Sequence, residues 1–319
     1  MRALTVVCLA GGVGGSRLAR GLLLAAPDQS LRVVVNTGDD LTLHGLRISP
    51  DVDTMLYTLS GRVDEARGWG PRGDTFRFMA LLERLGGETW FRLGDLDLAV
   101  HLRRTELLQA GWTPGAVTAE LAHHLGVPET VEVVPMTDDT VETWVQLAAD
   151  DEWVHFQRYF VEQRALVPIR AVRFEGIERA RPAPAVLDSF RRASAIVLCP
   201  SNPFVSLAPI LGLAGVREAV RAARARGVPV VGVSPIIGGA TVKGPAARML
   251  VELGHRPTAA AVAALYRELM DVFLIDTADR TLADEVAALG IRPVVADILM
   301  RGRRGAARLG RLVLRAAST

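Results

Sequence analysis

Two short acidic clusters are the residues of this chain best suited to carry out chemistry. The segment NTGDD occupies positions 36–40, and PDVDT follows at positions 50–54. Carboxylates combined with threonine and asparagine oxygens are hard ligands, which suit Mg²⁺ bound together with phosphate groups. Helix capping would explain one acid of the second cluster, but it leaves Asp39 and Asp40 unexplained. We therefore predict that the clusters bind a metal ion or a phosphate.

A glycine-rich loop, AGGVGGSR at positions 10–17, leads from an apolar run into a helical stretch. Glycines let backbone N–H groups approach an anion, and the start of a helix adds a favourable dipole, so a diphosphate or a nucleotide is the expected ligand. A tight turn alone would explain one or two of these glycines, but not all four. NAD is disfavoured, because Arg17 stands at the third glycine of the dinucleotide pattern and Asn36 stands where an acid usually binds the ribose.

Two further loops also follow apolar runs. The single lysine of the chain, Lys243, lies in SPIIGGATVKGP at positions 234–245. Its compact ammonium could hold a phosphate as a point charge, or it could be a surface lysine without a ligand. In the other loop Ser201 and Asn202 could bind a base, a sugar or a phosphate, or they could cap a turn. Ligands bind at the carboxyl edge of open α/β sheets, so we predict one cleft lined by all four segments.

Continuously apolar runs of strand length alternate with stretches of helical periodicity along most of the chain. The predicted strands are Leu4–Leu9, Leu31–Asn36, Ala195–Cys199, Val228–Val233, Asp271–Ile275 and Pro293–Ala296. Such strands belong in a parallel sheet that helices cover on both faces. The helices predicted to cover it include Ser16–Ala26, Val216–Arg226, Pro245–Leu253 and Thr258–Glu268. The alternation predicts an α/β fold with a doubly wound, mostly parallel, Rossmann-like sheet.

The alternation breaks between positions 51 and 125, where Leu, Met and Phe recur at helical spacing. The helices predicted there are Thr75–Leu85, Asp95–Gln109 and Pro114–Leu125. Strands expected in a flanking sheet or hairpin come next, at Val131–Pro135, Thr143–Leu147 and Ile169–Phe174. We predict a discontinuous nucleotide-binding domain of residues 1–50 and 126–319, with a helical insert domain at residues 51–125.

The composition argues against several classes of protein. Half of the 319 residues are hydrophobic and the net charge is +2, so the chain can bury a sizeable core. We interpret its arginine-rich C-terminus as a solvated helix face rather than an RNA- or membrane-binding tail. Cys8 and Cys199 are expected to be buried small hydrophobes, not a disulfide pair. No zinc pattern and no run of 18 apolar residues is present, and we expect a cytoplasmic protein that binds neither nucleic acid nor membrane.

The sequence resembles the 2-phospho-L-lactate transferase family, whose members complete the core of the deazaflavin coenzyme F-420. The resemblance runs in order from residue 10 to about residue 246. Its segments are AGGVGGSRLARGL, VNTGDDLTLHGLRISPDVDTMLYTLSG, GWGPRGDTF, WFRLGDLDLAVHLRRTELL, PMTDDTVETWV, HFQRYFVEQRA, CPSNPFVSLAPIL and SPIIGGATVKGPA. Together these motifs are highly specific, although each glycine loop alone would be a weak signal.

The resemblance implies a phosphoryl-type transfer. The ribityl hydroxyl of the deazaflavin Fo would attack a phosphorus of a guanosine diphospho-ester that carries a lactyl or an enolpyruvyl group. The phospho-lactyl or phospho-enolpyruvyl unit would move to Fo, and GMP would leave. The family requires Mg²⁺, and this reaction depends on positioning and charge neutralisation more than on covalent chemistry. The resemblance also implies a homodimer, the commonest closed arrangement.

The resemblance also implies roles for single residues. Metal ligands would be Asp39 and Asp53, with Asp51 and Asp40 as further candidates, and Asp39 or Asp40 would be the catalytic base. Donor nucleotide and phosphates would contact Gly11, Gly12, Gly14, Gly15, Ser201, Asn202, Gly238, Gly239 and Lys243. The deazaflavin would contact Asn36, Thr37, Thr54, Trp69, Arg72, Asp95 and His101, of which the last four could instead pack within the helical insert.

Two questions stay open at this stage. A related branch of the superfamily comprises non-catalytic, nucleotide-sugar-binding regulators of carbon metabolism, which resemble this chain less because they lack the paired acidic clusters. The donor could be lactyl or enolpyruvyl, and an arginine-heavy composition typical of GC-rich bacteria favours enolpyruvyl.

The chain departs from the pattern of the family beside Lys243. Family members carry Lys or Arg there and often a second basic residue at the position of Ala240. We therefore expect positive charge at this position to matter more than lysine itself.

Overall fold

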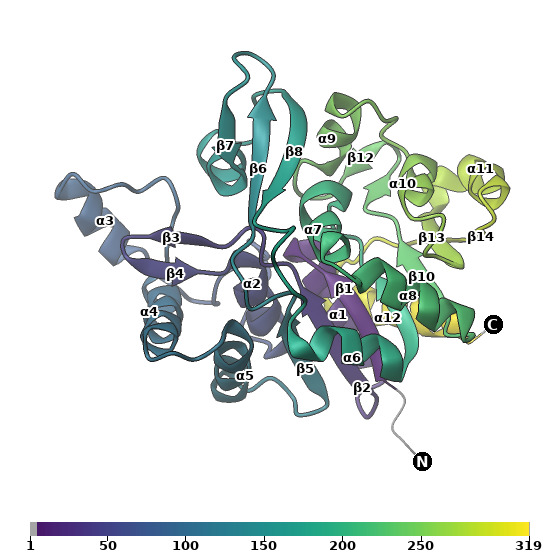
Figure 1. Cartoon of the computed structure of the whole chain (residues 1–319), viewed down its shortest axis with the longest axis horizontal. Coiled ribbons are helices and arrows are strands. Elements are labelled where there is room, and N and C mark those ends of the chain that lie inside the picture. The colour runs from purple at the N-terminus through teal and green to yellow at the C-terminus, as the bar shows by residue number, and fades with distance from the viewer. Residues whose placement is uncertain (1–4, 319) are drawn as a thin grey trace.

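A seven-stranded parallel sheet forms the centre of the molecule in the computed structural model, which describes residues 5–318 (Figure 1). The strand order is β14-β13-β10-β9-β1-β2-β5. The strands are β1 Thr5–Ala10, β2 Ser30–Val35, β5 Val131–Pro135, β9 Ala193–Leu198, β10 Val230–Val233, β13 Val272–Asp276 and β14 Arg292–Ala296. Every neighbouring pair is parallel, so all the carboxyl ends meet at one edge. This confirms the predicted α/β sheet.

Helices cover both faces of this sheet, because its strands are apolar on both sides. In β1, Val7 and Leu9 face one hydrophobic core while Val6 and Cys8 face the other. The first core is covered by α6 Pro184–Arg192, α7 Ala208–Gly212, α8 Val216–Ala225, α9 Ala246–Glu252, α10 Ala259–Leu265 and α11 Ala283–Ala288. The second is covered by α1 Gly12–Ala25, α2 Pro50–Leu59, α5 Pro114–Leu125 and α12 Gly302–Ala317.

Most of the predicted elements are confirmed to within two or three residues. Of the predicted strand Leu4–Leu9, residue Leu4 lies outside the described residues. The arginine-rich C-terminus is the helix α12, which buries Leu309 and Val313 and exposes Arg303 and Arg304. Cys8 and Cys199 are buried and free, as expected.

One predicted strand was assigned to the wrong sheet. Val131–Pro135 was expected in a flanking sheet or hairpin, but it is β5, the edge strand of the main sheet beside β2. It is parallel to β2, with Val33 opposite Val133. The long stretch from residue 36 to residue 130 is therefore the crossover connection between two neighbouring parallel strands, which require a long link.

This crossover contains elements close to the sheet and elements that extend from it. The hairpin of β3 Leu41–Leu43 and β4 Leu46–Ile48 packs with α3 Arg77–Arg84 and the start of α4 Asp95–Gln109 around a small core of their own. In Figure 1, α3 lies farthest from the main sheet. By contrast, α2 and α5 belong to the second core of the main sheet. The predicted domain boundaries at residues 50 and 126 stay a prediction.

A second, smaller sheet stands above the carboxyl edge of the main one in Figure 1. It is antiparallel, in the order β7-β6-β8, and consists of β6 Glu142–Leu147, β7 Trp153–His155 and β8 Ile169–Glu175. The remaining elements are β11 Ile236–Ile237, β12 Ala240–Thr241, the π-helical turns η1 Arg158–Glu162 and η2 Pro203–Leu207, and the 3₁₀ turn η3 Thr277–Leu282. The small sheet shares a core with η2 and α9, through Val205 and Met249.

Within residues 5–318 no single helix is both long and apolar enough to cross a membrane. By length and composition alone, one pair of helices bent by 83°, Pro203–Gly212 and Val216–Ala225, would pass such a test together.

Candidate active site

The loops after β1 and β9 meet at the point where the strand order changes direction, which is where open α/β sheets bind ligands. The buried Ser201 hydroxyl accepts a hydrogen bond from the Gly11 N–H at 3.1 Å and donates one to the Gly11 carbonyl at 2.8 Å. Ser201 therefore fastens the two loops together. Its predicted contact with the donor stays a prediction, and its hydroxyl is already satisfied by protein groups.

The predicted glycine loop is for the most part the first turn of α1, which begins at Gly12 and not at the predicted Ser16. Internal packing restricts all four glycines of this segment. A Cβ on Gly14 would overlap the Pro200 carbonyl oxygen, and one on Gly15 would lie 2.7 Å from the Ser201 hydroxyl. A Cβ on Gly11 would lie 2.5 Å from the Asp51 carboxylate, and Gly12 adopts φ +63°, a left-handed conformation that favours glycine. Packing within the protein therefore explains these glycines as well as a ligand would, and their contact with a donor stays a prediction. The loop can still bind an anion, because the first N–H groups of α1 have no partner within the helix.

Asp51 caps the N-terminus of α1 and not the N-terminus of α2, the helix to which it belongs. Its Oδ1 accepts the Gly12 N–H at 2.7 Å, and its Oδ2 accepts the Asn36 side-chain amide at 3.0 Å. Ser49, not Asp51 or Asp53, stands at the residue before α2. Burial raises the pKa of Asp51 to about 6, although the hydrogen bonds from Asn36 and Gly12 lower it.

Asp39 is a buried carboxylate that the protein satisfies only in part, and the side chains of Asn36 and Thr143 act to lower its pKa. It is 4% exposed, and its Oδ1 has no hydrogen-bond partner among residues 5–318. Burial raises the pKa of Asp39 well above its usual value, and the negative charges of Asp51 and Asp40 add to this effect. A divalent cation would restore the ionised form of such a group. Asp39 with the neighbouring Asp51 therefore offers the hard oxygen ligands that Mg²⁺ prefers.

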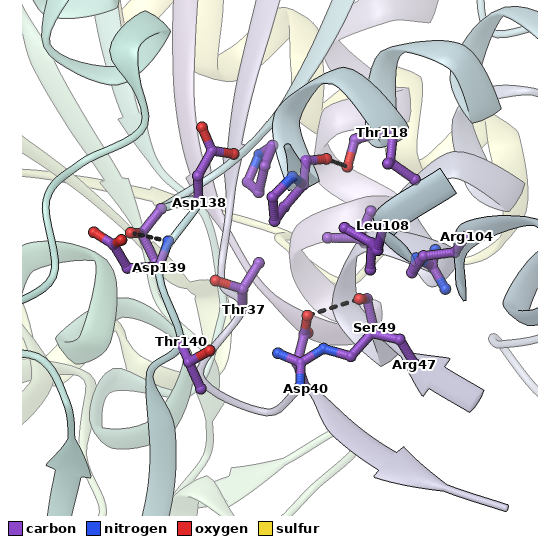
Figure 2. Close-up of a pocket in the computed structure, with 15 residues that line it drawn as sticks. Thr37, Asp40, Arg47, Ser49, Arg104, Leu108, Thr118, Asp138, Asp139 and Thr140 are labelled. Atoms are coloured by element: carbon purple, nitrogen blue, oxygen red, sulfur yellow. Dashed lines mark hydrogen bonds between the residues drawn. The ribbon is translucent and has the colours of Figure 1, made fainter. Parts of the chain in front are cut away.

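Asp40 faces a cavity of about 260 Å³ between β4, α4, α5 and the segment after β5 (Figure 2). Its Oδ2 accepts a hydrogen bond from Ser49 at 2.7 Å, while its buried Oδ1 has no partner within the described chain. Burial raises the pKa of Asp40 to about 7, although Arg47, Ser49 and Arg104 lower it. Five of the residues that line the cavity carry hydroxyl groups, namely Thr37, Ser49, Thr118, Thr137 and Thr140. The hydroxyls of Thr118 and Thr137 donate to backbone carbonyls.

These two raised pKa values predict that the free protein loses stability as the pH rises from about 5 to 7. Asp40 and Asp51 ionise at about 7 and 6 when folded, against 3.8 ordinarily. In this window the folded chain binds more protons than the unfolded chain, so the slope of unfolding free energy against pH is negative. Melting temperatures measured across this range should show a shallower slope for Asp40→Asn than for wild type. A matched change at the exposed Asp28, Asp28→Asn, should leave the slope unaltered, and equal slopes for all three proteins would contradict the assignment.

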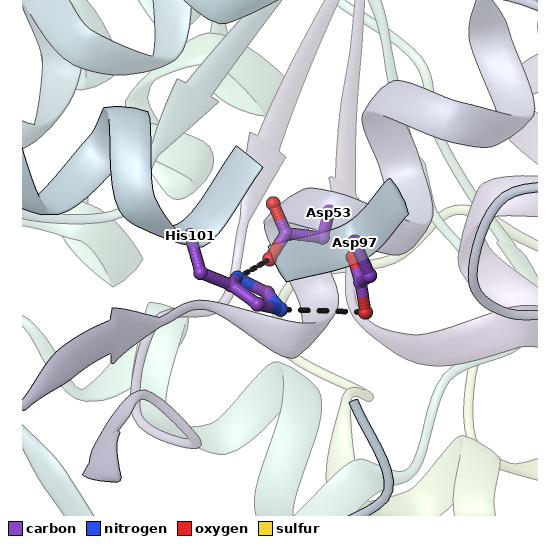
Figure 3. A group of neighbouring side chains, drawn as sticks. All are labelled: Asp53, Asp97 and His101. Atoms are coloured by element: carbon purple, nitrogen blue, oxygen red, sulfur yellow. Dashed lines mark ion pairs between the residues drawn. The ribbon is translucent and has the colours of Figure 1, made fainter. Parts of the chain in front are cut away.

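Asp53 belongs to a buried ion-pair network instead of facing the cavity. Both of its oxygens accept hydrogen bonds from Arg104, one of them at 3.0 Å. His101 lies between Asp53 and Asp97, with Nδ1 3.6 Å from Asp53 Oδ2 and Nε2 3.3 Å from Asp97 Oδ2 (Figure 3). Tyr57 donates to Asp97 at 2.6 Å. All five side chains are buried.

Three atoms of this network could in principle hold a metal ion. Asp53, Asp97 and His101 each offer a ligand atom, all within 4.8 Å of one another. The Arg104 guanidinium already neutralises Asp53, however, and a metal there would place a second cation against a buried positive charge. We therefore interpret the group as a structural ion-pair network. The predicted metal role of Asp53 stays a prediction that would require Arg104 to move away.

Lys243 meets the start of α1 beside Gly68. Its Nζ donates a hydrogen bond to the Arg67 carbonyl, and a Cβ on Gly68 would lie 3.0 Å from Lys243 Nζ, 3.5 Å from Arg17 Nη2 and 2.9 Å from Val13. Burial and the neighbouring Arg17 lower the pKa of Lys243. Two cations, Lys243 and Arg17, therefore lie next to the first turn of α1.

Other predicted donor contacts are engaged within the protein. The Gly238 N–H donates to the Asp279 carboxylate, at 3.1 and 3.0 Å to its two oxygens. Gly239 adopts φ +80°. Asn202 Oδ1 accepts the Phe204 N–H at 2.9 Å and thereby caps η2. These residues shape their loops, and their contact with a ligand stays a prediction.

Most of the predicted deazaflavin contacts are not among the residues that line the cavity. Thr37 lines the cavity, and buried Thr54 is on α2. Asp95 accepts hydrogen bonds from Thr75 and from the first N–H groups around α3. Trp69 and Arg72 are exposed. The residues that line the cavity include none of Trp69, Arg72, Asp95 and His101.

Comparison with known proteins gives a consistent picture. The model of the family 2-phospho-L-lactate transferase CofD matches residues 6–316. A phosphoenolpyruvate transferase from Streptomyces griseus is 45% identical over 316 residues, which cover 98% of this chain and 98% of that protein. A 2-phospho-L-lactate transferase from Methanosarcina mazei is 36% identical over 313 residues, which cover 98% of this chain and 100% of that protein. A solved member of the upf0052 family from Bacillus halodurans has a TM-score of 0.66 at 17% identity, covers 98% of this chain and 99% of its own, and shares the fold.

Proposed function

We propose a function for this chain from its membership of the 2-phospho-L-lactate transferase CofD family. The protein transfers a phospho-enolpyruvyl group from a guanosine diphospho-ester to the ribityl hydroxyl of the deazaflavin Fo. GMP is the leaving group, and the reaction belongs to coenzyme F-420 biosynthesis. Six relatives named phosphoenolpyruvate transferase are 40–45% identical to this chain, against 36–39% for two named 2-phospho-L-lactate transferase. This difference supports the enolpyruvyl donor over the lactyl donor.

The unsatisfied carboxylates of Asp39 and Asp40 carry this proposal most directly. Both are buried, and each has one oxygen without a hydrogen-bond partner in the described part of the chain. Buried, unpaired carboxylates are costly unless a ligand satisfies them. Asp39, beside Asp51, fits Mg²⁺, which when bound would neutralise phosphate charge. Asp40 faces the hydroxyl-rich cavity, which suits the ribityl chain of Fo.

Asp40 is the better of the two candidates for the base. In the transfer, the Fo hydroxyl oxygen forms a bond to phosphorus, the bond from phosphorus to the GMP oxygen breaks, and the hydroxyl proton passes to a carboxylate. A pKa of about 7 suits a group that accepts this proton near neutral pH. Ser49 holds Oδ2, which leaves Oδ1 to receive the proton.

The donor would lie where α1 begins. The cations of Lys243 and Arg17 lie beside Gly68 together with the side chain of Val13, which belongs to the first turn of α1. Helix starts with adjacent cations bind phosphate oxygens. This place is joined to Asp51 through the Gly12 N–H, so donor phosphates and the aspartates would be neighbours.

The test is a discontinuous assay for GMP with purified protein, Mg²⁺, Fo and each of the two donors. We expect GMP release with both Fo and the enolpyruvyl donor present, and slower release with the lactyl donor. No release with either donor, combined with tight binding of UDP-sugars, would overturn the proposal in favour of a nucleotide-sugar-binding regulator. Light scattering of the same sample would test the expected homodimer.

For Lys243 we expect charge to matter more than the identity of the side chain. Lys243→Arg should retain most of the activity, whereas Lys243→Ala should raise the KM for the donor by about tenfold, the effect of one charge-assisted contact. Both variants are to be compared by initial rates over a series of donor concentrations. If Lys243→Arg is as impaired as Lys243→Ala, the compact ammonium itself is required.

A further inference from the structure

The small sheet reaches the turn that carries Asp39 and Asp40 through Thr143. The Thr143 N–H donates a hydrogen bond to the Gly38 carbonyl at 2.7 Å. The side chain of Thr143 is fully buried, and a Cβ on Gly38 would lie 2.7 Å from its hydroxyl oxygen. The first residues of β6 are therefore packed directly against the residue that precedes the two aspartates.

A second residue of the small sheet, His155, faces the same turn. The side chains of Val154 and Phe156 belong to the core of the small sheet, so His155 lies on the opposite face of the strand, since side chains alternate. His155 stands opposite Trp144 in the register of β6 and β7, and its ring meets the indole edge-on at 5.8 Å and 87°. The imidazole is therefore held by the sheet without forming part of the core of the sheet.

The hydrogen bonds of the imidazole determine where its proton lies. Nδ1 of His155 accepts the Gln157 N–H at 3.2 Å, so the neutral ring carries its hydrogen on Nε2. Nε2 is buried and has no partner of normal geometry in residues 5–318. The backbone of Asp40 is beside it and raises the pKa of His155. A buried donor without a partner is rare in native proteins and often marks a functional position.

The charges around His155 favour the neutral ring. Burial lowers the pKa of His155, and Arg158 of η1 and Arg47 of β4 act in the same direction. Glu142 of β6 and the Asp40 backbone act in the opposite direction, but the net effect is a lowered pKa. At neutral pH the His155 ring therefore offers a single N–H group, on Nε2.

We propose that His155 is a positioning residue, whose Nε2–H group binds the Asp40 carbonyl and so orients the turn that carries Asp39 and Asp40. The proposal rests on the transferase function proposed above. Hydrogen bonds of this kind are often long in a free enzyme and shorten when substrate binds. Thr143 fixes one end of the turn at the Gly38 carbonyl, and His155 fixes the other end. The small sheet thus keeps the two aspartates aligned with each other.

The first experiment compares two substitutions of the same residue. His155→Leu removes the N–H donor, and we expect kcat to fall about tenfold, the effect of one lost hydrogen bond, with the donor KM within about twofold. His155→Gln can place an amide N–H near the position of Nε2, and we expect it to retain at least about a third of wild-type kcat. His124→Gln, at an exposed histidine on α5, is the control and should match wild type. Equal loss in His155→Leu and His155→Gln, or full activity in His155→Leu, would overturn the proposal.

The second experiment does not depend on turnover. Nitrogen NMR of protein labelled with ¹⁵N-histidine, with His155→Gln used to assign the signal, reports which ring nitrogen carries hydrogen. We expect His155 as the Nε2–H tautomer, and a ring protonated on Nδ1 alone would overturn the proposal. If wild type releases no GMP from either donor, the proposed function fails, and the NMR result still decides whether Nε2 of His155 carries the hydrogen that the contact with the Asp40 carbonyl requires.

Discussion

Replacing Asp39 with asparagine is expected to lower turnover about 100-fold, the typical loss when one group that stabilises transition-state charge is removed. Asp39 is buried, its Oδ1 has no protein partner among the described residues, and the Asp51 carboxylate is near enough to raise its pKa. The measurement is the initial rate of GMP release over a series of Mg²⁺ concentrations. Near-normal turnover of Asp39→Asn at saturating Mg²⁺ would contradict the assignment, and Asp28→Asn on the surface serves as the matched control.

The same substitution should have the opposite effect on the free protein. Burial and neighbouring carboxylates hold the pKa of Asp39 well above its usual value, which means that its charge destabilises the fold near neutral pH. Asparagine carries no charge, so Asp39→Asn should melt at the same temperature as wild type or higher. An active-site group that lowers stability is a common trade-off in enzymes. Activity that falls together with melting temperature would instead indicate general structural damage.

Replacing Arg104 with leucine is expected to lower the free energy of unfolding by about 3–5 kcal/mol, the usual effect of removing one partner from a buried ion pair. Arg104 is 4% exposed and binds both oxygens of Asp53. Without it, Asp53 and Asp97 would be buried close together with much less positive charge to balance them. Urea unfolding at neutral pH, followed by circular dichroism, measures the change.

The adjacent Arg103 offers a matched control for this experiment. It lies on the same helix, is 51% exposed and pairs with Glu106 on the surface. Arg103→Leu should change the free energy of unfolding by no more than about 0.5 kcal/mol, as surface substitutions usually do. The double variant Asp53→Asn/Arg104→Leu should recover part of the stability lost in Arg104→Leu, because the unpaired charge is gone. A single-variant loss below about 1 kcal/mol would contradict the buried ion-pair interpretation.

The sequence was most informative where local signals coincided. Helix α5 begins after Thr113, whose hydroxyl accepts the Ala116 N–H at 3.2 Å, and it ends at Gly126 with φ +80°. Both the cap and the terminal glycine could be recognised from residue types alone. The hairpin of β3 and β4 was missed, although its turn, His44 and Gly45 with positive φ, lies between alternating apolar residues. Its strands are only three residues long, which is too short for a periodic signal.

Strand pairing and side-chain partners could not be predicted in this way. Val131–Pro135 was recognised as a strand, but its neighbour is set by the path of a crossover of more than 90 residues. In the site, the motifs pointed to the aspartates. They gave no indication that Arg104 would neutralise Asp53 or that His155 would approach Asp40, because each partner comes from a distant part of the chain. Local patterns report burial and turns, whereas charge balance depends on the assembled fold.

The close junction between the loops after β1 and β9 limits how this protein can be re-engineered. Gly11, Gly14 and Gly15 leave no room for a Cβ, and Ser201 is bonded on both sides to Gly11. A mutant library directed at that junction would mostly yield unfolded chains. The hydroxyl-rich cavity is the opposite case, since Leu108, Thr118 and Thr140 line it from three separate segments. Altered acceptor preference is therefore best sought by varying that wall while the glycine junction is left intact.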